Sequence, residues 1–68
     1  MLKQALISKL EGEVSVHRAD LRKFLENPIG VAEHIDFVAT AEKKLELLAT
    51  AEDKLERLKK LWVKIVKK

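Results

Sequence analysis

One break in the sequence decides what this chain can fold into. Pro28 lacks a backbone N–H and disfavours helical geometry at Asn27, and Gly30 tolerates positive φ angles, so a helix that arrives from the N-terminal side ends here. We interpret Asn27, Pro28 and Gly30 as a turn. After this turn the chain contains no further Pro or Gly, and before it the only such residue is Gly12. The sequence therefore consists of two long segments joined by one turn.

The segment before the turn follows the period of an α-helix. Its apolar positions recur at steps of three and four when His17 is counted among them, which places them on one helix face. These positions are Leu2, Leu6, Leu10, Val14, His17, Leu21 and Phe24. The spacing predicts a helix over residues 2–26. Gly12 costs about 1 kcal/mol relative to Ala, and the valines that follow it are mediocre helix formers, so a break near residues 11–15, or a short strand there, remains an alternative.

The segment after the turn has the same period and is rich in Ala, Leu, Glu and Lys, which are strong helix formers. Its apolar stripe consists of Phe37, Ala41, Leu48, Ala51, Leu55, Leu58, Trp62 and Ile65, and is widened by Val38, Leu45 and Val66. We predict a second helix over about residues 34–66. Its first residue, somewhere between Val31 and Asp36, is not determined, because Ile35 is not a residue type that caps a helix.

Two amphipathic helices joined by a turn predict an all-α antiparallel hairpin, with residues 1–68 as a single domain. At ~1.5 Å per residue the second helix is about 50 Å long and the first about 36 Å, so the end of the second helix extends past the first. Leaving its large apolar residues in water forfeits on the order of 1.5–3 kcal/mol each. We therefore predict a homodimer in which two hairpins form a four-helix bundle. The expected interface residues are Leu58, Leu61, Trp62, Ile65 and Val66.

The sequence contains no recognisable catalytic or cofactor-binding pattern. There is no Cys, two Gly cannot form a phosphate-binding loop, and no hydroxyl side chain has a histidine at helical spacing. The Glu-x-x-His signature of di-iron bundles is absent, since valines lie three residues before both His17 and His34. Glu13 and His17 could form half of a metal site, although a hydrogen-bonded histidine in the helix contact explains them as well. We expect no enzyme, no catalytic or metal-binding residue, no cofactor and no small-molecule substrate.

The excess of positive over negative charge is confined to the C-terminal end. Residues 1–56 carry a net charge of −3, whereas residues 57–68 carry +6. Cations stabilise the C-terminal end of a helix, where the helix dipole is negative, so the cluster of basic residues has a structural explanation. Nucleic-acid binding is the alternative function, because clustered lysines suit phosphate contacts. The residues available for such contacts are Lys59, Lys60, Lys64, Lys67 and Lys68. Association with a membrane surface through the amphipathic C-terminal helix is a second alternative.

A motif spans the turn and reads NPIGVAEHID over residues 27–36. It resembles an N-P-x-G-x-x-E-H-x-D turn that joins two helices in small proteins of T4-like marine cyanophages. The resemblance implies a phage accessory protein acting in the cytoplasm of a bacterial host, and it implies no mechanism. No apolar run approaches the ~20 residues of a membrane span. The expected function is therefore non-enzymatic: helical self-association, or interaction with an unidentified protein.

Overall fold

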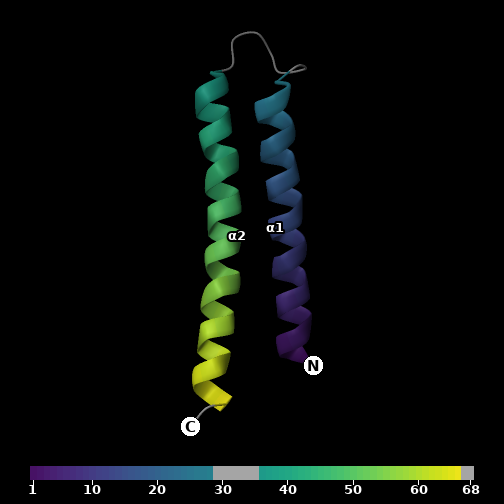
Figure 1. Cartoon of the computed structure of the whole chain (residues 1–68), viewed down its shortest axis with the longest axis vertical. Coiled ribbons are helices and arrows are strands. Elements are labelled where there is room, and N and C mark those ends of the chain that lie inside the picture. Colours follow the sequence, from purple (N-terminus) through teal and green to yellow (C-terminus); the bar gives the residue numbers. More distant parts are fainter. Residues whose placement is uncertain (29–35, 67–68) are drawn as a thin grey trace.

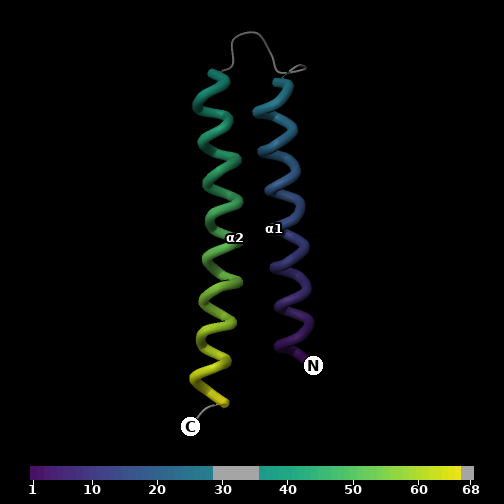
Figure 2. The backbone as a smooth tube through the Cα atoms, in the orientation of Figure 1, coloured from purple at the N-terminus to yellow at the C-terminus, as the bar shows by residue number. Residues whose placement is uncertain are grey.

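Two antiparallel helices make up the structure, a computed structural model that describes residues 1–28 and 36–66. Helix α1 spans Leu2–Glu26 and helix α2 spans Phe37–Val66. They lie side by side along their length, and the start of α1 is at the same end of the hairpin as the end of α2 (Figure 1). The backbone trace in Figure 2 shows two almost straight rods, and the Cα atoms span 55 × 18 × 15 Å. The predicted all-α hairpin is confirmed.

Helix α1 passes through Gly12 without interruption, so the expected alternative of a break or strand at residues 11–15 is wrong. The reason lies in the packing on either side of this glycine. Leu10 and Val14 flank Gly12 and are both buried against α2, with 5% and 7% of their surface exposed. Packing against a partner helix supplies more stability than the weak local propensity removes.

Gly12 offers a simple test of this continuous helix. A Cβ atom built on Gly12 meets no atom within 4 Å, and the residue is exposed. Gly12→Ala is therefore expected to raise the free energy of unfolding by about 1 kcal/mol, because alanine loses less backbone entropy in a helix. Urea unfolding followed by circular dichroism measures the change. Ala19→Gly is the reciprocal control, with a loss of similar size expected. Destabilisation by Gly12→Ala would contradict an unbroken helix.

Helix α2 begins at Phe37 because Asp36 caps it. The Asp36 Oδ1 atom accepts hydrogen bonds from the backbone N–H groups of Val38 at 2.9 Å and Ala39 at 3.2 Å. These are N–H groups that no carbonyl of the helix can satisfy. The expected start at residue 34 is therefore corrected to residue 37. Gly30 of the predicted turn lies outside the described residues, as do His34 and Ile35.

Removing this cap is expected to destabilise the hairpin. Asp36→Ala leaves two N–H groups without their side-chain acceptor and should lower the free energy of unfolding by about 1 kcal/mol. Asp36→Asn keeps an acceptor oxygen and should retain most of the stability, which separates capping from the general effect of mutation. Thermal unfolding of the three proteins measures the difference. Equal stability of Asp36→Ala and the native protein would contradict the cap.

The core of the hairpin is a narrow seam. Among the described residues, only four are buried: Leu10, Val14, Leu48 and Ala51. Val14, Leu48 and Ala51 form one cluster, and Leu21 and Leu55 pack against it and are half-buried. At the turn end the rings of Phe24 and Phe37 meet edge to face, with centroids 6.3 Å apart. A seam this thin leaves most of the circumference of both helices uncovered.

The two helices overlap further than the sequence predicted. The Lys3 ammonium lies 4.4 Å from the ring centroid of Trp62, so Trp62 is beside the first turn of α1 and does not extend past it. Because α2 begins at Phe37, later than expected, each of its residues lies about one helical turn nearer to the turn end of α1 than the sequence predicted. The part of α2 that extends beyond α1 is correspondingly shorter than expected.

Candidate interaction surface

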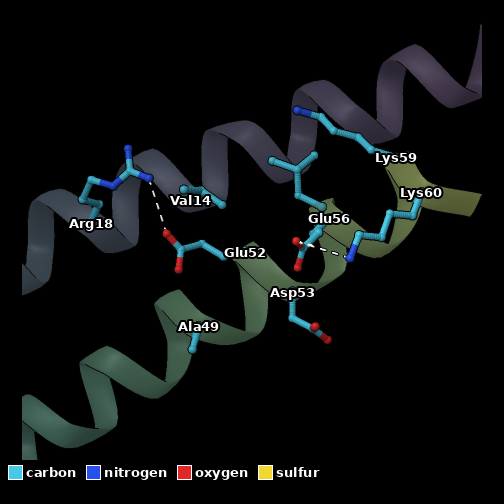
Figure 3. A pocket seen from close by; sticks show the side chains of 9 residues that line it. Val14, Arg18, Ala49, Glu52, Asp53, Glu56, Lys59 and Lys60 are labelled. Atoms are coloured by element: carbon cyan, nitrogen blue, oxygen red, sulfur yellow. Dashed lines mark hydrogen bonds and ion pairs between the residues drawn. The ribbon is translucent and has the colours of Figure 1, made fainter. Parts of the chain in front are cut away.

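One side of the hairpin carries a shallow groove between the helices, and we call this side the groove face. Arg18 of α1 reaches across one end of the groove to Glu52 of α2, while Glu56 and Lys60 pair along α2 (Figure 3). The groove has a volume of about 630 Å³. Its other lining residues are Val14, Ala49, Asp53, Leu55 and Lys59. Apolar side chains and charged side chains thus share one open surface.

Ion pairs between the helices also lie on the groove face. Arg18 Nη2 is 3.4 Å from Glu52 Oε2, and Lys59 Nζ is 4.0 Å from Glu11 Oε2. All four side chains are largely exposed, so each pair contributes about 0–1 kcal/mol. Their main effect is on orientation, because they place a band of alternating charge across the middle of this face.

The opposite side of the hairpin carries a second polar cluster. Glu13, His17 and Lys54 line a hollow there together with Leu47. The Glu13 carboxylate accepts a hydrogen bond from Lys9, and this bond, with the charges of Lys9, Lys54 and His17, lowers the pKa of Glu13. His17 is half-buried at the edge of the seam. Within residues 1–28 and 36–66, no group of three or more acidic, histidine or cysteine side chains is arranged to hold a metal ion.

The lowered pKa of Glu13 predicts how the hairpin responds to acid. The Glu13 carboxyl group binds a proton less tightly in the folded chain than in the unfolded chain. Its interactions therefore stabilise the hairpin above the unfolded pKa of ~4.3, and this stability is lost as the pH falls through the lower pKa of the folded chain. Melting temperatures of the native protein and Glu13→Gln should therefore differ near neutral pH and converge in acid. A difference that stays constant across this range would contradict the assignment.

A lysine occupies one position of the seam itself. Lys44 is half-buried, and its Nζ atom lies 2.8 Å from Asp20 Oδ2 and 5.5 Å from the ring centroid of Phe24. Salt bridge and cation–π contact together satisfy a charge that would otherwise be poorly placed beside apolar side chains. The pair fixes which residues of α1 and α2 face each other near the turn.

The terminal end of the hairpin exposes large apolar side chains. Leu61 and Val66 are 55% and 58% exposed, and Ile65 is similar. Trp62, at 38%, is partly covered by Lys3, and Leu58 is half-buried. Of the residues predicted to form an interface, Leu61, Ile65 and Val66 are thus about half exposed, while Leu58 and Trp62 already take part in the hairpin.

The basic residues of the same end are partly neutralised within the chain. Lys60 pairs with Glu56 at 3.6 Å, and Lys59 is near Glu11. Lys64 is exposed and has no ion-pair partner among the described residues. Lys67 and Lys68 lie outside the described residues. The three described lysines that were predicted to contact anions, Lys59, Lys60 and Lys64, therefore do not form one free cationic cluster.

Two contacts of the hairpin escaped the sequence analysis. Lys44 was not singled out, although it stands three residues after Ala41 and four before Leu48, at a seam position of the stripe. The contact of Lys3 with Trp62 depends on the length of the connection, which no periodicity reveals.

No family model matches the chain, and no curated protein or solved structure shows significant similarity to it. Neither described helix combines the length and apolar character needed to cross a membrane.

Proposed function

We propose that this protein is a non-enzymatic self-association module whose hairpins pair into a four-helix bundle. The observation that carries the proposal is the imbalance between buried and exposed apolar residues. Only four residues are buried in the described chain, whereas fourteen large hydrophobic side chains are exposed there, including Leu25, Val38, Leu45 and Val66. Exposed apolar surface on this scale is typical of proteins that bind another helical surface.

The total surface supports the same proposal. The chain exposes 5732 Å², whereas a compact monomer of 7.8 kDa would expose roughly 4,400 Å². Its radius of gyration is 15.7 Å, against about 11 Å for a compact domain of this length. The excess area of roughly 1,300 Å² exceeds the ~800 Å² that each partner contributes to a standard interface. A second copy is the simplest partner, because it needs no other component.

Light scattering coupled to size-exclusion chromatography tests the proposal. A particle of twice the 7.8 kDa chain mass is expected at micromolar concentration. A particle that keeps the mass of one chain at high micromolar concentration would overturn it.

The resemblance of residues 27–36 to phage proteins adds the prediction of a phage accessory role in a host cytoplasm.

A membrane surface is a second candidate partner, and the exposed apolar residues at the end of α2 favour it. Leu61, Val63 and Val66 stand beside Lys60 and Lys64, a combination typical of interfacial helices. Co-sedimentation with anionic vesicles, with a blue shift of Trp62 fluorescence, would support this candidate. Nucleic-acid binding has less support, since Lys59 and Lys60 approach acidic residues of the same chain.

A further inference from the structure

The groove face has apolar residues at both ends and charged residues in its middle. Along α2, Val38, Leu45 and Val66 lie at seven-residue steps from Glu52, so they share its side of the helix to within about 20° per step. Leu25 of α1 is likewise seven residues beyond Arg18. All of these apolar residues are exposed. The turn end thus presents Leu25, Val38 and Leu45, and the terminal end presents Val66 together with Val63.

The opposite side lacks this pattern. Leu47 is exposed near the middle of that side, beside Glu13 and Lys54, and its other exposed apolar residues, Leu2, Leu6, Leu61 and Ile65, gather at the terminal end. Between Leu47 and the turn this side carries mainly polar residues, among them Thr40, Lys43, Lys44 and Asp20. A second copy placed on this side would bury charged groups under apolar ones. Two copies can therefore pair their apolar residues better through their groove faces than through their opposite sides.

Charge along α2 distinguishes between the two ways of pairing this face. Residues 36–53 carry a net charge of −3, and residues 54–66 carry +4. A parallel pair would set like charges against each other in both halves, whereas an antiparallel pair sets each basic half against an acidic one. The helix dipoles of two α2 helices are also favourably opposed in the antiparallel arrangement.

We propose that two hairpins associate through their groove faces in antiparallel orientation, with the two-fold axis near Asp53. This inference rests on the proposed self-association and specifies its interface. Glu46 and Lys60 are equally far from Asp53 along the chain, so Glu46 of one copy lies level with Lys60 of the other. The turn-end patch of each copy, with Leu45 at its centre, covers the Val63 and Val66 patch of the other. The two Arg18–Glu52 pairs meet near the axis, where their charges balance.

Single cysteines test the orientation, because the native chain has no cysteine. Asp53→Cys lies at the axis and should cross-link to itself with a short thiol-specific reagent. Val63→Cys should not cross-link to itself, since the two copies of residue 63 would be roughly 30 Å apart along the helices at ~1.5 Å per residue. A mixture of Val63→Cys and Glu42→Cys should cross-link efficiently between the two variants. Thr50→Cys lies on the opposite side of α2, in the hollow with Glu13 and His17, and is the negative control.

The outcomes separate this inference from the proposed function. Self-cross-linking of Val63→Cys, or no cross-link in the mixture, would overturn the antiparallel groove-face pairing even when light scattering shows a dimer. A monomer in light scattering would overturn both. Salt gives a second readout: raising ionic strength from about 0.01 M to about 1 M shortens the Debye length from about 30 Å to about 3 Å. The antiparallel dimer should weaken under this change, and a dimer that becomes tighter would contradict it.

Discussion

Leu48→Ala is expected to lower the free energy of unfolding by about 2–5 kcal/mol, the largest effect of any apolar truncation in α2. Leu48 is one of four buried residues in the described chain and packs in one cluster with Val14 and Ala51. Truncation removes contacts that a two-helix seam cannot replace from neighbouring layers. For a hairpin of this size, such a loss leaves much of the population unfolded at 25 °C.

Leu47→Ala is the matched control, because Leu47 adjoins Leu48 in the same helix but is 46% exposed. It should cost well under half as much. Urea unfolding of both variants, followed by helical circular dichroism, gives the comparison. Equal losses for the two variants would mean that the seam does not run through Leu48.

Leu45→Glu is expected to weaken self-association by at least about tenfold, which corresponds to ~1.4 kcal/mol. Leu45 is 52% exposed, so a glutamate there is solvated in a separate hairpin and should not unfold it. In the proposed dimer the same carboxylate would replace an apolar contact with Val63 and Val66 and lose its hydration. Lys60 of the other copy, which lies level with Glu46, offsets only part of that cost. The effect should therefore appear in assembly rather than in folding.

Leu47→Glu provides the control for this substitution. It introduces the same charge two residues away, on the side of α2 that lines the hollow with Glu13 and Lys54. The dimer dissociation constant of Leu47→Glu, measured by sedimentation equilibrium, should stay within a few fold of the native value. If Leu47→Glu dissociates the dimer and Leu45→Glu does not, the groove face is not the interface.

The sequence was sufficient to predict the two helices, because a three-four apolar period and one Pro-Gly turn leave few alternatives. Val14 and Leu48, both expected on the buried stripe, do occupy the core. The behaviour of Gly12 was not predictable from propensity, since packing of Leu10 and Val14 on either side outweighs a local cost of about 1 kcal/mol. Contacts between the two helices keep α1 continuous at Gly12, and the helix propensities of single residues do not predict these contacts.

The register of the helices was also beyond the sequence. The expectation that Trp62 extends past the first helix depended on where the second helix starts, and a shift of about one turn brought Trp62 beside Lys3. The exposure of Val38 and Val63 follows from the direction of the seam, which periodicity alone does not define. By contrast, the charge difference between the two halves of α2 is visible in the sequence, and it determines the proposed orientation.

Sedimentation equilibrium over a range from low to high micromolar concentration tests the central claim most directly. Self-association predicts a mass that approaches twice the 7.8 kDa chain as concentration rises, with weaker association at higher salt. A mass that remains at one chain throughout the range, with helicity intact, would contradict it.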